Sequence, residues 1–136
     1  MEDILHDLNP AQKEAVEHTE GPALVVAGAG SGRTRVLTYR IAYLIGRRKV
    51  HPTNILAVTF TNKAAREMKA RIEALVGESS RQIWAGTFHS ICARILRVHG
   101  EAVGLSNDFT IFDDADQIAL VTECVEQMAL PEQKYQ

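Results

Sequence analysis

A glycine-rich run between an apolar segment and a helix-like segment constrains this chain more than any other feature. The run covers residues 27–34, Ala-Gly-Ala-Gly-Ser-Gly-Arg-Thr, and follows the continuous apolar stretch 23–27. Glycines let successive backbone N–H groups turn inward, and the start of the following helix adds the positive end of its dipole. The pattern therefore predicts a phosphate-binding loop, with the N–H groups of residues 30–34 facing the phosphate and the Thr34 hydroxyl ligating magnesium.

Two positions depart from the usual pattern of such a loop. Ala27 stands at the first glycine position, and Arg33 stands where lysine is expected. A guanidinium keeps the positive charge, but it is planar and bulkier than an ammonium, so it cannot hold the same position. Because the loss of one transition-state donor costs roughly 10²–10³-fold in rate, we expect nucleotide binding with poor hydrolysis. The alternative is that Arg33 points outward and has no role.

Apolar runs alternate with helix-like segments along most of the chain, which is typical of an α/β fold. Strands about thirty residues apart, each followed by a helix, predict right-handed βαβ units and a doubly wound parallel sheet. The expected strands are 23–27, 55–59 and 82–87, with a possible short fourth strand at 109–112; we expect 23–27 and 55–59 to be buried on both faces.

The expected helices show start signals and apolar stripes. Asn9, Pro10 and Gln12 predict a capped helix that runs to about His18. Asp113 or Asp114 is expected to cap a helix that Pro131 stops. One helix is expected over 62–76, with Glu67 and Arg71 paired on its polar face, and others end before Gly46 and near Gly100.

Each expected helix has an apolar stripe that should face inward. The stripes are Val36, Leu37, Ile41, Leu44 and Ile45; Ala65, Met68, Ile72 and Leu75; Ile91, Ile95 and Leu96; and Ile118, Val121, Val125 and Met128.

Composition restricts the classes of function. The net charge of −2 over 136 residues excludes a generally basic coat, so a contact with nucleic acid needs a local surface. The spacing of Cys92 and Cys124 fits no metal site, and we expect both to be buried. No apolar stretch approaches the ~20 residues of a membrane span, so we expect a cytoplasmic protein with no membrane partner. Trp84 and Phe112 are expected to be aromatic residues of the core. Residues 47–49 are expected to form a charged helix end on the surface; the alternative is that these three residues contact DNA.

Four blocks, in this order, resemble the UvrD/PcrA/Rep family of superfamily 1 DNA helicases. They are Leu-Asn-Pro-x-Gln at 8–12, AGAGSGxTRVL at 27–37, ILAVTFTNKAA at 55–65 and GTFHS at 86–90. The resemblance covers essentially the whole chain and implies an incomplete, RecA-like P-loop NTPase sheet flanked by helices. It implies that 1–113 form the N-terminal part of the first ATP-binding domain and that 114–136 begin an inserted helical subdomain. An unrelated P-loop kinase has no reason to carry the last two blocks.

The resemblance also implies roles for individual residues. Gln12 resembles a glutamine that binds adenine, although a capping box explains it equally well, and Arg35 resembles a neighbour of that base. Asn62 is either part of the DNA-contacting segment or an ordinary helix cap, and we assign no proton transfer to His89. The expected ATP-binding residues are Gln12, Ala27, Gly28, Ala29, Gly30, Ser31, Gly32, Arg33, Thr34 and Arg35, with Arg33 and Thr34 also catalytic and Thr34 on Mg²⁺; the expected DNA-binding residues are Phe60, Thr61, Asn62, Lys63, Thr87, Phe88 and His89.

The DExx block of the family, which supplies carboxylates for magnesium and water, has no counterpart after residue 90; Asp113 and Asp114 lack its pattern. Phosphoryl transfer needs such groups together. We therefore expect the ATP- and single-strand-DNA-binding segment of a 3′-to-5′ helicase, with the second RecA-like domain as its partner, and no hydrolysis or unwinding by this chain alone. The alternative is a non-catalytic nucleotide- or DNA-binding module that regulates a partner. Repair and replication both remain open.

Overall fold

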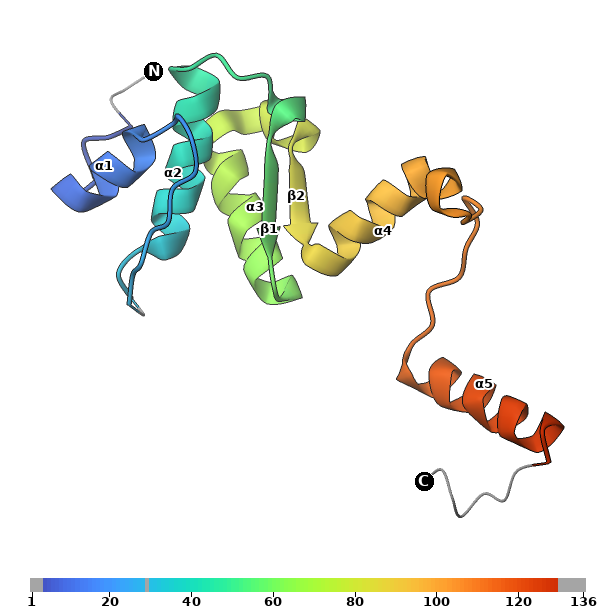
Figure 1. Ribbon diagram of the computed structural model, residues 1–136. Helices are drawn as coiled ribbons and strands as arrows, with labels where there is room; N and C mark the ends of the chain where they lie inside the picture. Colours follow the sequence, from blue (N-terminus) through green and yellow to red (C-terminus); the bar gives the residue numbers. More distant parts are fainter. Residues whose placement is uncertain (1–3, 29, 130–136) are drawn as a thin grey trace. The chain divides into compact units, whose positions relative to one another are not determined.

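The computed structural model describes residues 4–28 and 30–129. Within them, two strands form a small parallel sheet, and helices make up most of the remaining regular structure (Figure 1). The chain divides into one compact unit up to Arg94 and a second from Ile95. The elements in chain order are α1 (Pro10–Glu17), α2 (Arg33–Gly46), η1 (Pro52–Asn54), β1 (Leu56–Thr59), α3 (Asn62–Val76), η2 (Gly77–Gln82), β2 (Trp84–Thr87), α4 (Phe88–His99), η3 (Gly100–Val103) and α5 (Asp114–Gln127).

Strands β1 and β2 pair in parallel, and α3 forms the connection between them (Figure 1). The register places Leu56 beside Trp84 and Thr59 beside Thr87. This confirms the predicted strands at 55–59 and 82–87 and their parallel direction. The expectation that the first of these is buried on both faces is wrong, because Leu56 is 57% exposed while Ala57 is buried. The strand has a layer of helix on one face only.

The main core of the first unit lies where α2 and α3 cover the sheet. Met68 and Ile72 of α3 are fully buried there, as the stripe predicted. Burial of such side chains contributes about 1.5–3 kcal/mol each. The buried members are Ile41, Ile55, Ala57, Met68, Ile72 and Ile83, with Leu37, Leu44 and Ile45 partly buried around them. On the outer face of α3, Glu67 and Arg71 form the predicted ion pair.

A second, smaller core joins α1 to α2. Its buried members are Leu5, Val16 of α1 and Val36 of α2, and Tyr39 and Tyr43 pack around them. Helix α1 begins with the predicted capping box. It is held on α2 by this apolar contact and by polar contacts at both of its ends, which position the candidate site.

The prediction of a buried strand at 23–27 is wrong. Residues 22–28 have no regular structure, and Leu24 and Val26 are 91% and 90% exposed. A strand exists only where a neighbour takes up its backbone hydrogen bonds. Among the described residues, β1 pairs with β2 and neither pairs with this segment. The segment has the apolar composition of a buried strand, but composition does not show whether another strand lies beside it.

The second unit consists of the end of α4, η3, an irregular segment and α5. The possible strand at 109–112 is not formed. Arg97 organises this segment instead, because its Nη1 donates to the Asn107 carbonyl at 2.6 Å and its guanidinium lies 4.0 Å from the centre of the Phe109 ring. Helix α5 begins with a capping box of Asp113 and Asp116, which confirms the predicted start. The predicted stop, Pro131, lies outside the described residues, as does Ala29 of the glycine-rich loop.

Several expected core residues lie on the surface. Cys92 and Cys124 are exposed, as are Phe112 and Ile95, and Trp84 is half-buried with the Arg94 guanidinium 4.1 Å from its ring centre. The physical reason is that α4 buries one described residue and α5 buries none, so their apolar stripes have little to cover them. The predicted boundary between residues 113 and 114 stays a prediction. No helix in the described ranges is long and apolar enough to cross a membrane.

Candidate functional site

The glycine-rich loop makes a tight turn directly before α2. Gly30 and Gly32 have φ angles of 79° and 86°, in the left-handed region that favours glycine. The Ser31 hydroxyl donates to the Gly28 carbonyl at 2.6 Å, and the Ser31 N–H donates to the same carbonyl at 3.3 Å. The turn is therefore held by Ser31 and made possible by the two glycines.

The start of α2 has no side-chain cap. Its N-cap is Gly32, which has no side chain to accept the orphan N–H groups of the first turn. The starts of α1, α3 and α5 each have such an acceptor, from Asn9, Thr61 and Asp113 respectively. Backbone donors and the positive helix end at Arg33 thus remain available to an anion.

Gln12 connects α1 to this loop. Its Nε2 donates to the Ser31 carbonyl at 3.0 Å, and its Oε1 accepts from the Asn9 N–H at 3.2 Å as part of the capping box. The side chain lies so close to the loop that a Cβ added to Gly32 would come within 2.7 Å of Nε2. A glutamine amide carries two N–H donors and two acceptor lone pairs. One donor and one lone pair of Gln12 therefore remain for a ligand.

A cavity of about 690 Å³ lies between α1, the glycine-rich loop and α2. This is within the usual range of small-molecule pockets, about 300–1,000 Å³. Its walls include five of the predicted nucleotide-binding residues, namely Gln12, Ala27, Gly28, Ser31 and Arg33, together with Asn9, Ala11, Ala15, Ala23, Val25, Val26, Val36, Leu37 and Arg40. Gly30, Gly32, Thr34 and Arg35 do not line it.

The predicted magnesium ligand, Thr34, lies in the first turn of α2 and is half-buried. Its carbonyl accepts a hydrogen bond from the Thr38 hydroxyl at 3.0 Å. Across the part of the chain that is described, no three His, Cys, Asp or Glu residues gather as a metal site would require. A magnesium ion here would depend on Thr34 and on oxygens of its phosphate ligand.

The two predicted DNA-contacting segments lie together at one edge of the sheet. Because Thr59 and Thr87 are partners in the register, Phe60 and Phe88 emerge side by side from the carboxyl ends of β1 and β2. Their ring centres are 5.1 Å apart, and the ring planes are inclined by 43°. Phe60 is 87% exposed and Phe88 is 45% exposed. The pair forms an aromatic surface open to solvent, at the edge where open α/β sheets bind ligands.

The start of α3 borders this aromatic pair. Thr61 is the N-cap, and its hydroxyl oxygen accepts from the Ala64 N–H at 3.1 Å. The interpretation of Asn62 as an ordinary cap is therefore wrong: Asn62 is the first helical residue and is exposed, as is Lys63. Both side chains are available beside Phe60.

Thr87 has a structural position. It is 6% exposed, and its hydroxyl oxygen accepts from the Ser90 N–H at 3.2 Å at the start of α4. A Cβ added to Gly86 would lie 2.5 Å from the Ser90 Oγ, so a larger residue there would require the Ser90 side chain to move. The side chains open to a ligand in this block are Phe88 and His89.

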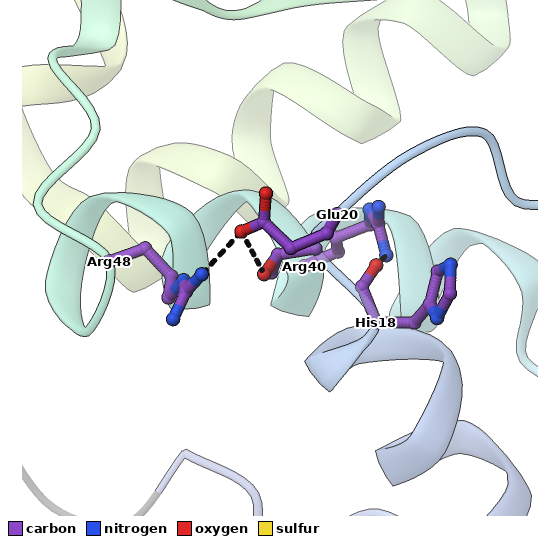
Figure 2. A network of polar contacts seen from close by, with 5 residues as sticks. His18, Glu20, Arg40 and Arg48 are labelled. Atoms are coloured by element: carbon purple, nitrogen blue, oxygen red, sulfur yellow. Dashed lines mark hydrogen bonds and ion pairs between the residues drawn. The ribbon is translucent and has the colours of Figure 1, made fainter.

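Arg40 is a residue of the candidate site that was not predicted from the sequence. It lines the cavity and donates to the backbone carbonyls of Ala15 and His18. Figure 2 shows Arg40 beside His18. A signal was present: Arg40 lies one turn after Val36 and one turn before Tyr43, on the face of α2 that packs against α1. A cation on a packed face needs buried acceptors, and carbonyls at a helix end supply them.

Residues 8–136 match the UvrD/REP helicase N-terminal domain family. This chain belongs to that family. It is 50% identical over 136 residues to the ATP-dependent DNA helicase PcrA of Staphylococcus epidermidis, a match that covers 100% of this chain and 19% of that protein. The Bacillus subtilis PcrA is 52% identical over 132 residues, covering 97% and 18%. The Staphylococcus aureus PcrA is 49% identical over 136 residues, covering 100% and 19%. The chain thus spans about a fifth of the length of these curated relatives.

Proposed function

We propose that this chain is the ATP-binding and single-stranded-DNA-binding N-terminal segment of a UvrD-like, ATP-dependent 3′-to-5′ DNA helicase. In this proposal residues 1–113 belong to a RecA-like P-loop domain and 114–136 begin an inserted helical subdomain. Family membership supports the class of protein. The observation that carries the nucleotide site is the uncapped start of α2 behind two left-handed glycines, next to a cavity of nucleotide size.

Adenine recognition is proposed for Gln12, with Arg35 beside the base. A glutamine amide binds the N6 and N7 edge of adenine with one acceptor and one donor. Gln12 retains one of each after its bonds to Asn9 and Ser31. The capping box and adenine binding are therefore compatible in a single side-chain position.

Phosphate binding is proposed for the backbone N–H groups of residues 30–34, with Arg33 supplying positive charge. Arg33 lines the cavity, which favours a role over the outward-pointing alternative. Magnesium, when bound with the nucleotide, supplies charge neutralisation of the phosphates, and we propose that the Thr34 hydroxyl would hold it. Because a guanidinium cannot occupy the volume of an ammonium, we propose that the site binds ATP and hydrolyses it poorly.

Single-stranded DNA binding is proposed for the edge formed by Phe60 and Phe88. Exposed rings stack on bases without regard to sequence, and neighbouring N–H, hydroxyl and cationic groups hold phosphates. Asn62 and Lys63 follow Phe60 closely in the chain, His89 follows Phe88, and all three are exposed. In the complete motor, ATP would bind between this domain and a second RecA-like domain, and closure of that cleft would shift the grip of this edge on the strand.

Two titrations test the proposal. A fluorescent ATP analogue is expected to bind the chain only when magnesium is present, and a labelled single strand is expected to bind with an affinity that falls as salt rises. No hydrolysis or unwinding by the chain alone is expected. The absence of any magnesium-dependent ATP binding would overturn the nucleotide site, and preference for duplex over single strand would overturn the DNA site. Binding without turnover in the protein with its natural flanking sequence would favour a regulatory module instead.

A further inference from the structure

Helix α1 lacks a cation of its own at its C-terminal end. No basic residue lies in its last turn, and the last carbonyls of any helix have no partner within the helix. Arg40 of α2 fills this position. Its Nη1 donates to the Ala15 carbonyl at 2.8 Å and to the carbonyl of His18, the C-cap residue. Figure 2 shows Arg40 reaching across to this turn.

Helix α1 is thereby attached to α2 at two points. At its first turn Gln12 bonds to Ser31 of the loop, and at its last turn Ala15 and His18 bond to Arg40. The apolar contact of Val16 with Val36 lies between the two. Apolar packing is non-directional, so the polar contacts at the two ends determine the register of α1 along α2.

We infer that Arg40 is a positioning residue of the nucleotide site, because its hold on the end of α1 sets where the Gln12 amide stands against the phosphate-binding loop. The inference rests on the proposed function. Arg40 also lines the cavity and could touch the nucleotide directly. In this inference Arg40 instead acts through the position of Gln12. A guanidinium bonded to two carbonyls keeps its geometry because charge-assisted hydrogen bonds are about twice as strong as neutral ones.

The chain offers a matched control. Arg48, two residues after the end of α2, also contacts the segment after α1, through an ion pair with Glu20 (Figure 2). Both partners are substantially exposed, at 46% and 84%, and exposed pairs contribute little. Arg48→Ala therefore removes a similar charge just beyond the end of α2 without releasing the carbonyls of α1.

The test is a double-mutant cycle on Arg40 and Gln12, in the protein with its natural flanking sequence. Dissociation constants for fluorescent ATP and GTP analogues are measured with magnesium. Guanine presents O6, an acceptor, where adenine presents a donor, so Gln12 distinguishes the two. We expect Gln12→Ala to weaken ATP binding roughly three- to tenfold with little change for GTP, as expected for one or two hydrogen bonds. Arg40→Ala is expected to do the same, with no further loss in the double variant, and Arg48→Ala to bind as the unsubstituted protein does.

Three results would overturn the inference: unchanged ATP binding in Arg40→Ala, equal losses for ATP and GTP, or additive losses in the double variant. The last two would indicate direct contact with the phosphates or a general loss of structure. If Arg40→Ala does not fold, Arg40→Lys takes its place in the cycle, with a smaller expected ATP-specific loss, and an unchanged ATP-to-GTP ratio overturns the inference. Failure of the unsubstituted protein to bind MgATP would instead overturn the proposed function.

Discussion

Helices α2 and α3 both begin directly after a loop, yet α3 receives an acceptor from the residue before it and α2 does not. The Thr61 hydroxyl oxygen accepts from the third N–H of α3 at 3.1 Å. At the corresponding position of α2 stands Gly32, which offers no side chain. The first arrangement stabilises the helix by itself. The second arrangement leaves the N–H groups free to bind a ligand. A missing cap therefore indicates a ligand site when the helix start lies beside a cavity, but not when it lies on an open surface.

The largest effect is expected at the first helical residue of α2. Arg33→Lys, in the protein with its natural flanking sequence, should raise DNA-stimulated ATP turnover by roughly 10²–10³-fold, because an ammonium restores a positioned transition-state donor. Steady-state phosphate release measures this. Arg47→Lys, at the other end of the same helix, should leave turnover unchanged. An unchanged rate in Arg33→Lys would show that the shape of the guanidinium does not limit the reaction.

The next effect concerns the cap position itself. Gly32→Ala should weaken MgATP binding by about tenfold or more, because a left-handed alanine costs on the order of 1–3 kcal/mol and its methyl would displace the Gln12 amide. Gly21→Ala is the control: Gly21 has a φ of 72° but nothing within 4 Å of an added Cβ. It should lose stability without losing affinity. Equal losses of affinity in the two variants would mean that backbone strain alone, and not the loop geometry, weakens binding.

Substitutions of the residues that flank the cap of α3 should change the affinity for DNA and leave the affinity for nucleotide unchanged. Replacing Phe60 and Lys63 together by Ala should weaken single-strand binding about fivefold to a hundredfold, since base stacking on an aromatic is worth about 1–3 kcal/mol. The slope of the logarithm of the binding constant against the logarithm of the salt concentration should fall in magnitude by about one, because one phosphate contact is lost. Fluorescence anisotropy at several salt concentrations measures both. Phe112→Ala, which removes another exposed ring, should bind DNA normally; a loss there equal to that of the pair would remove the assignment of this edge.

The smallest effect is expected at the cap of α3. Thr61→Ala should lower the free energy of unfolding by about 1 kcal/mol, the usual value of an N-cap side chain, while Thr61→Ser should retain most of it. Urea denaturation followed by circular dichroism measures this. MgATP affinity should not change. If Thr61→Ala weakened ATP binding as strongly as Gly32→Ala, the contrast between the two helix starts would be wrong.

Local interactions could be predicted from the sequence because they join residues three or four positions apart. The capping box of Asn9 and Gln12, the ion pair of Glu67 and Arg71 and the buried stripe of α3 all formed as expected. The parallel pairing of β1 and β2 also followed, since the helix between them fixes the direction of the second strand. These features depend on short spacing or on the handedness of the chain.

Features that need a distant partner could not be predicted in the same way. The segment 23–27 has the composition of a buried strand but no strand pairs with it among the described residues. The contacts of Arg40 could not be predicted because its acceptors are backbone carbonyls, which no sequence pattern marks; only its place on the packed face of α2 was visible in the sequence. The alternative that Asn62 is the cap of α3 was wrong by one residue, because Asn and Thr are both good caps and only the backbone angles decide between them.

The exposed apolar run at 23–27 has a practical consequence for the isolated chain. Its five residues carry no charge and no proline, and Leu24 and Val26 are almost fully open to water. Such a segment can pair with the same segment of another copy of the chain, and this association increases with protein concentration. Dilute samples and a solubilising charge outside the loop, for example at Leu24, should keep the chain monomeric during measurements.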